Sequence, residues 1–207
     1  MIRILGKASS INVRKVLWVC DEIGVSYERE DWGIGFRDTR VPEFLTLNPN
    51  GLVPVVLIDG APLWESNAIL RYLASQYGRT DLLPAEPGPR AQVEKWMDWQ
   101  ATEFNNAWRY AFQALVRKNP DFTDPDQLHV SLRDWSRHVE ILEAVLRSSP
   151  YVSGAAFTLA DIPIGLALNR WFAAPIPERP AFPAVTAYFD RLSARSAFMR
   201  HGRNGLP

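Results

Sequence analysis

The sequence predicts two structural units in one chain, a mixed α/β sheet unit followed by an all-helical unit. Three observations lead to this prediction. Short apolar runs alternate with helical patterns as far as residue 78, a proline-rich stretch covers residues 79–89, and only helical periodicity follows it. We therefore expect domains at residues 1–78 and 90–207, joined by a linker at residues 79–89.

The first unit is expected to run strand, helix, strand, helix, strand, strand, helix. Its predicted strands cover residues 2–5, 26–31, 55–58 and 62–64, and its predicted helices cover residues 11–23, 42–47 and 66–77. Asp59-Gly60 is a favoured pair for a tight hairpin between the last two strands. Pro62 assigns the returning strand to an edge of the sheet, because proline cannot donate to a neighbour. Such an order predicts a mixed sheet covered by helices.

The second unit is expected to be a bundle of helices. Its predicted helices cover residues 90–118 (one helix or a kinked pair), 128–146, a segment after Thr158, and 183–199. Thr158 can cap the third helix while Asp161 reaches back to the backbone of the cap. Pro163 is awkward there, because it forfeits a backbone hydrogen bond early in that helix.

Composition and charge exclude several classes of function. Lys and Arg together number 23, as do Asp and Glu, so the balance gives no reason to expect nucleic acid or a membrane surface as partner. Cys20 is the only cysteine, and the three histidines lack metal-ligand spacing. The apolar stretch at residues 157–177 is interrupted by Asp161 and Arg170. We expect a cytoplasmic protein without metal or membrane span.

Two serines stand at helix starts, where backbone N–H groups and the helix dipole favour an anion. Ser66 opens the helix at residues 66–77, and the preceding Glu65 can pair with an ammonium group. Ser10 directly precedes the helix at residues 11–23. From the residues alone, ordinary helix capping explains these serines equally well, and Ser9 can also cap.

Three motifs together resemble the cytosolic glutathione transferases, over nearly the whole chain. They are Val53-Pro54 before the hairpin, Glu65-Ser66 at a helix start, and G-x-x-x-T-x-A-D from Gly154 to Asp161. The resemblance is to bacterial theta- and delta-like members that use a serine. It implies a thioredoxin-like first domain (βαβαββα), an all-helical second domain and a homodimer.

The same resemblance assigns a glutathione site. It implies a cis bond between Val53 and Pro54, with the Val53 backbone binding the cysteinyl part of glutathione. Glu65 and Ser66 match the pair that binds the γ-glutamyl end. Thr39 matches a position that contacts the glycyl carboxylate.

The resemblance also assigns the reactive group. Ser10 matches the serine that stabilises the glutathione thiolate, and a hydroxyl hydrogen bond beside a helix start can lower a thiol pKa. Asn12 makes the pattern similar to the Thr-x-Asn arrangement of a bacterial group that reduces disulfides with glutathione. Cys20 lies too far along the helix for catalysis and is expected in the core. Leu52 stands where the family has a polar or basic residue.

The second substrate is expected against the long helix, with Asn105, Arg109, Tyr110 and Trp171 as its wall; simple packing is the alternative for Arg109 and Tyr110. The predicted function is glutathione transfer to a hydrophobic electrophile, with glutathione as co-substrate and no other cofactor. The alternatives are a glutathione-dependent disulfide reductase or peroxidase, and a non-catalytic binding or regulatory module. The matches at Ser10 and Glu65-Ser66 argue against the module.

Overall fold

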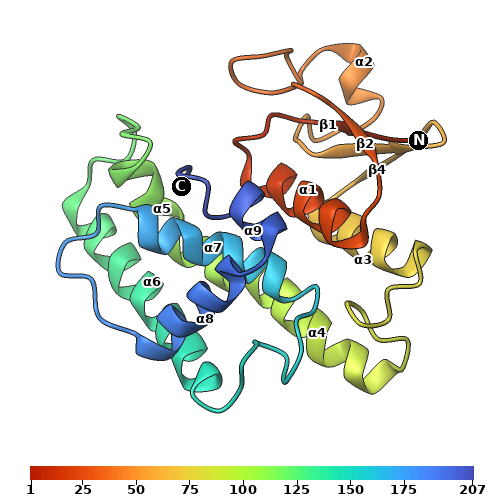
Figure 1. Cartoon of the computed structure of the whole chain (residues 1–207). Helices are drawn as coiled ribbons and strands as arrows, with labels where there is room; N and C mark the ends of the chain where they lie inside the picture. The colour runs from red at the N-terminus through yellow and green to blue at the C-terminus, as the bar shows by residue number, and fades with distance from the viewer.

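The computed structural model describes all residues from Met1 to Pro207. A four-stranded sheet with its helices lies beside an all-helical unit (Figure 1). The strands are β1 (Ile2–Leu5), β2 (Tyr27–Glu30), β3 (Val55–Ile58) and β4 (Ala61–Trp64), in the order β2-β1-β3-β4. β1 pairs in parallel with β2 and antiparallel with β3, and β3 pairs antiparallel with β4. The predicted mixed sheet is confirmed.

Local sequence signals define the first unit closely. Its helices are α1 (Ile11–Ile23), α2 (Pro42–Leu45) and α3 (Ser66–Gln76). Gly24 ends α1 in the left-handed conformation, with φ 80°. Asp59 and Gly60 both have positive φ, as a two-residue hairpin turn requires. β4 is an edge strand, in agreement with the position of Pro62.

The second unit contains one continuous run and four further helices. The run consists of α4 (Pro87–Trp99), a π-helical segment η1 (Gln100–Phe104) and α5 (Asn105–Leu115). The other helices are α6 (Pro125–Leu146), α7 (Asp161–Ala173), α8 (Pro183–Ser193) and α9 (Ser196–His201). α7 is buried from residue 161 to residue 171 and lies among the other helices (Figure 1). No helix is long and apolar enough to cross a bilayer.

Two predictions about these helices were wrong. The single helix expected at residues 183–199 is divided, because Arg195 is extended and donates to both carboxylate oxygens of Glu22, at 2.8 and 2.6 Å. This turn lets α9 pack on α1. Pro163 occupies the third position of α7, where a backbone N–H would have no partner inside the helix, so it forfeits no hydrogen bond within α7.

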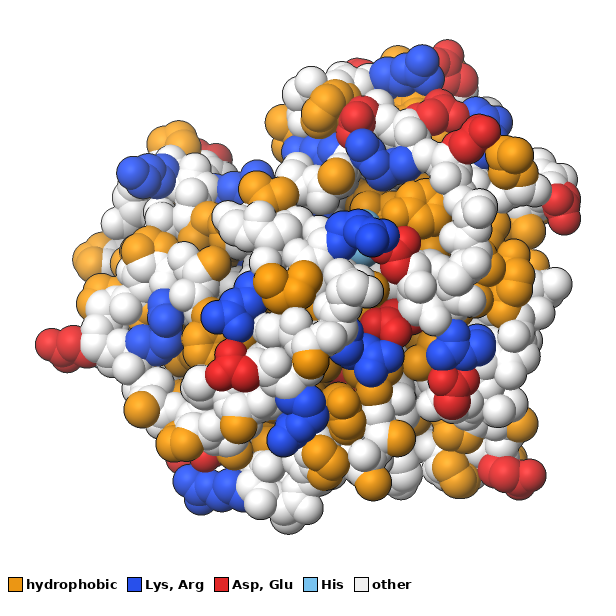
Figure 2. Space-filling model, in the orientation of Figure 1, with side chains coloured by type: hydrophobic (Ala, Val, Ile, Leu, Met, Phe, Trp, Pro, Cys, Tyr) orange, Lys and Arg blue, Asp and Glu red, His pale blue; other side chains and the backbone are white.

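Charge is mixed on the face of the molecule shown in Figure 2. Basic and acidic side chains are interspersed over the face shown in Figure 2, in keeping with their equal numbers. This face therefore carries no large area of one sign and gives no electrostatic reason to expect a polyanionic partner there.

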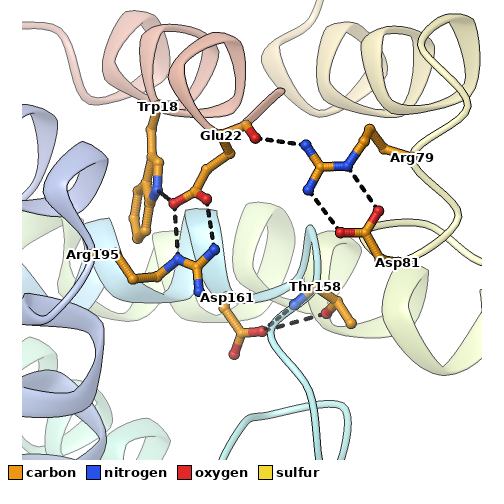
Figure 3. A network of polar contacts seen from close by, with 7 residues as sticks. All are labelled: Trp18, Glu22, Arg79, Asp81, Thr158, Asp161 and Arg195. Carbon is orange, nitrogen blue, oxygen red and sulfur yellow. Dashed lines mark hydrogen bonds and ion pairs between the residues drawn. The ribbon is translucent and has the colours of Figure 1, made fainter. Parts of the chain in front are cut away.

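Polar contacts fix the sheet unit against the helical unit (Figure 3). Glu22 of α1 accepts from Trp18 Nε1 at 2.8 Å as well as from Arg195, and its backbone oxygen accepts from Arg79 at 2.6 Å.

Asp161 at the start of α7 accepts from Thr158 N at 2.8 Å, as the sequence predicts. It also accepts from the Tyr188 hydroxyl at 2.8 Å. Burial raises the pKa of Asp161 to about 6.

Candidate active site

Two adjoining cavities lie between the sheet unit and the helical unit. The larger has a volume of about 510 Å³ and the smaller about 400 Å³. Asn12 and Asn105 line both cavities, so the two spaces meet at these side chains. Of the predicted site residues, the larger cavity holds Ser10, Asn12, Thr39, Val53, Asn105 and Arg109, and the smaller holds Asn12, Glu65, Ser66 and Asn105. A separate cavity of about 540 Å³ lies between α5 and α6.

Ser10 is the N-cap residue of α1 and lies beside the first backbone N–H groups of the helix, which have no partner within it. Its φ and ψ are −75° and 125°, and its backbone oxygen accepts the first helical bond, from Arg14 N at 2.9 Å. The side chain makes no capping hydrogen bond. The hydroxyl can therefore serve an anion in the larger cavity, beside the positive end of the helix dipole.

Val53 reaches the larger cavity because the chain approaches α1 very closely. The Val53–Pro54 peptide bond is cis. A Cβ at Gly6 would lie 2.5 Å from Val13 Cγ2 and 3.1 Å from Val53 Cβ, and Gly6 has φ 153°. Only glycine permits this approach, so Gly6 fixes the position of the Val53 backbone relative to Ser10.

The start of α3 forms one wall of the smaller cavity. Ser66 is buried, and its hydroxyl donates to Asn12 Oδ1 at 3.4 Å. Glu65 has φ 69°, an uncommon conformation for a residue with a side chain. Strain of this kind is often found at binding sites, where it fixes the direction of a side chain. Together the two residues offer a carboxylate, a hydroxyl and the N-terminus of a helix.

Two models of known protein families match the chain. The model of the glutathione S-transferase N-terminal domain matches residues 2–75, and that of the C-terminal domain matches residues 106–196. The chain belongs to the glutathione S-transferase family. The predicted family, fold class and enzyme class are confirmed.

Individual members of the glutathione S-transferase family resemble the chain over nearly its full length. Glutathione S-transferase GstB of Escherichia coli is 36% identical over 199 residues, which are 95% of each chain. Glutathione S-transferase 3 of Zea mays is 33% identical over 210 residues, covering 96% of this chain and 92% of that one. A theta class glutathione S-transferase of Xanthomonas axonopodis pv. citri, solved with glutathione bound, is 38% identical with a TM-score of 0.92. That comparison covers 100% of this chain and 99% of the other.

Lys15 is a cavity-lining residue that was not predicted from the sequence. It lines the smaller cavity with Glu65 and Ser66, and only 3% of it is exposed. Its Nζ donates to Gln100 Oε1 at 3.0 Å. Burial and the charge of Arg170 lower the pKa of Lys15 to about 7, whereas the charge of Glu65 acts in the opposite direction. The available signal was a lysine inside the almost wholly buried helix α1.

The helical wall of this transferase differs in part from the prediction. Asn105 and Arg109 line the larger cavity, joined by the buried Trp108 and Phe112. Tyr110 instead lines the separate cavity between α5 and α6, where its hydroxyl accepts from Asp124 N at 2.9 Å. Trp171 is 1% exposed and packs against Trp135 in the core.

The remaining side chains agree with simple burial arguments. Cys20 is fully buried, and burial raises its pKa to about 12, which removes it as a nucleophile. Leu52 is exposed and lines the larger cavity beside Thr39. No group of histidine, cysteine and carboxylate side chains is arranged to hold a metal ion.

Proposed function

We propose that this protein conjugates glutathione to electrophiles, with Ser10 donating a hydrogen bond to the glutathione thiolate. The observation that carries the proposal is the Ser10 hydroxyl, which is not used as a helix cap and lies in a cavity that meets the Ser66 cavity at Asn12. One extended tripeptide can therefore place its γ-glutamyl end at Ser66 and its sulfur at Ser10.

Each part of glutathione meets suitable chemistry in this arrangement. The γ-glutamyl carboxylate binds Ser66 and the N-terminus of α3, and its ammonium pairs with Glu65. The backbone of Val53 pairs with the cysteinyl part, and Thr39 lies toward the glycyl end. Asn12 lies where the two cavities meet and supports the sulfur together with Ser10. Asn105 and Arg109 face the second substrate.

The chemical gain comes from ionising the thiol. A free thiol with pKa about 8.5 is about 3% thiolate at pH 7, and a shift of two units raises this to about 75%. The sulfur then attacks an electrophilic carbon, a C–S bond forms, and the leaving group departs with its electron pair. The thiol proton is released to solvent.

The test is Ser10→Ala with Ser9→Ala as the matched control, since Ser9 does not line either cavity. Loss of a hydrogen bond to a charged sulfur should raise the pKa of bound glutathione by about one to two units. Ultraviolet titration of the bound thiolate and the pH profile of conjugation to a chlorinated nitroaromatic both report this shift. An unchanged profile in Ser10→Ala would remove Ser10 from the mechanism.

Glutathione-dependent disulfide reduction or peroxidase activity is the second candidate, favoured by the position of Asn12 between the cavities. Cys20 is buried, so such a reaction would use the glutathione sulfur alone. Parallel assays of conjugation and of reduction of a small disulfide separate the two. If glutathione neither retains the protein on a column nor raises its Tm, a binding module becomes the better description.

We also propose a homodimer located in the cytoplasm, as the family resemblance implies. Three exposed aromatic residues support an interface there, because they would be buried by a partner: Trp64 on β4, Tyr72 on α3 and Tyr77 directly after α3. Light scattering after gel filtration measures the mass in solution. A monomeric mass at micromolar concentration would contradict the dimer.

A further inference from the structure

The larger cavity has a one-sided charge. Its seventeen lining residues include Lys7, Arg109, Arg117 and Arg170 but no aspartate or glutamate. The whole chain has equal numbers of basic and acidic residues, so this excess is local. None of the four cations takes part in an ion pair. The positive lining of the cavity therefore favours the binding of an anion.

Arg170 is the least ordinary of these cations. It is 5% exposed, and its Nε is buried without a hydrogen-bond partner. Its guanidinium lies 4.1 Å from the ring centre of Phe112 and 4.6 Å from that of Trp108. The rings cover the flat guanidinium but accept none of its N–H groups in its plane. Burying an unpaired charge is unfavourable, and an anion bound beside Arg170 would offset this cost.

A second donor at the same wall is also unsatisfied. The indole Nε1 of Trp108 is buried and has no acceptor, and Trp108 lines the cavity together with Arg170. The Arg170 guanidinium supplies the charge that favours a carboxylate, and the Trp108 N–H is a further donor at the same wall. A neutral apolar ligand would leave both donors without partners.

Arg170 lines the same cavity as Ser10 and Val53 but belongs to its helical wall. Arg170 lies on α7 and Trp108 on α5, in the helical unit. Ser10 and Val53, and the start of α3, belong to the sheet unit on the other side. Lys7 also belongs to the sheet unit, where its Nζ donates to Ile34 O at 3.0 Å. An anion at Arg170 therefore belongs to the second substrate.

We propose that Arg170 is a specificity-determining residue that binds a carboxylate on the second substrate, assisted by Arg117 and Arg109. The inference rests on the proposed function and names its substrate class: small electrophiles that carry a carboxylate. In the reaction the glutathione thiolate forms a C–S bond at the electrophilic carbon, and a halide leaves with the bonding electrons. The carboxylate remains unchanged and orients the substrate.

The test compares 4-chloro-3-nitrobenzoate with its uncharged primary amide. For each compound, kcat/KM is divided by its uncatalysed rate constant with glutathione, which corrects for intrinsic reactivity. We expect the unmodified protein to prefer the carboxylate by about tenfold or more, the equivalent of one charge-assisted contact. Arg170→Met should reduce the ratio to about one. Arg133→Met, an exposed arginine on α6 outside both cavities, is the charge-matched control and should keep the ratio.

A second measurement needs no variant and covers the case in which Arg170→Met fails to fold. Benzoate should inhibit the unmodified protein competitively against 4-chloro-3-nitrobenzoate, and benzamide should do so at least tenfold more weakly. Equal inhibition by both, or an unchanged ratio in a folded Arg170→Met, overturns the inference. Equal normalised rates for carboxylate and amide overturn it while leaving the proposed function intact. If neither compound is conjugated, the proposed function itself is contradicted, and this inference falls with it.

Discussion

Replacing Lys15 by methionine should abolish a proton uptake that accompanies glutathione binding. Lys15 is buried in the wall of the smaller cavity, and burial lowers its pKa to about 7. The γ-glutamyl carboxylate of glutathione would enter the same cavity beside Ser66. A new anion there favours the charged ammonium, so the pKa of Lys15 must rise when the ligand binds.

The size of the uptake follows from these values. At pH 7.5 a lysine with pKa about 7 is about one-quarter charged. An opposite charge within 4 to 6 Å shifts a pKa by about one to three units, which makes the lysine at least about three-quarters charged. Binding should therefore take up about half a proton or more per site.

Titration calorimetry in buffers of different ionisation enthalpy measures this uptake. S-methylglutathione is the ligand of choice, because it has no thiol whose own ionisation would release a proton. Lys15→Met should bind it with an uptake near zero. Lys95→Met, which removes an exposed lysine of α4 outside both cavities, should behave like the unmodified protein.

Stability gives an independent check with a defined sign. Because the folded-state pKa of Lys15 lies below its ordinary value of 10.5, the folded protein binds fewer protons than the unfolded chain between pH 7 and 10.5. The unmodified protein must therefore gain stability relative to Lys15→Met as pH rises through this window. Two pH units inside it correspond to about 3 kcal/mol. Equal proton uptake in both proteins, or parallel stability curves, would refute the reasoning.

Four further predictions concern the framework and the glutathione site. Asp161→Ala leaves Thr158 N, Val152 N and the Tyr188 hydroxyl without their acceptor, and should lower the free energy of unfolding by about 3 kcal/mol or more in urea titrations. The raised pKa of Asp161 means that the unmodified protein loses stability as pH rises from about 4 to about 6, a loss that Asp161→Asn should not show. Gly6→Ala should raise KM for glutathione and lower stability by about 1–3 kcal/mol, because its Cβ would collide with Val13, whereas Gly88→Ala meets open space and should do neither. Ser66→Ala should raise KM for glutathione about tenfold with little change in kcat; an unchanged KM would remove it from the γ-glutamyl site.

Much of the framework could be read from the sequence, because its signals are local. Asp59-Gly60 determines a hairpin turn within two residues, and Gly24 determines the end of α1 within one turn of helix. Residues 53 and 54, 65 and 66, and 154 to 161 are likewise short motifs whose order resembles one family. Each was interpretable without knowledge of its distant neighbours.

The orientation of α5 about its own axis could not be predicted from the sequence. Arg109 and Tyr110 are adjacent and differ by about 100° around α5. The sequence offered both as wall residues, yet Arg109 faces the larger cavity and Tyr110 the separate cavity against α6. Which side faces the sheet unit depends on the packing of α5 against α6 and α7. That packing involves segments far apart in the chain.

The sequence by itself determined the family, the mixed sheet with its helical partner unit, and the short motifs around Ser10, Val53 and Glu65. Tertiary structure alone decided which charges became buried. Lys15 looked like a helix lysine, and Arg170 served only to argue against a membrane span, until α1, α5 and α7 closed around two cavities. The physical reason is that the pKa and the pairing of a charge depend on its surroundings in space. Those surroundings come from residues more than 80 positions apart, such as Lys15 and Gln100.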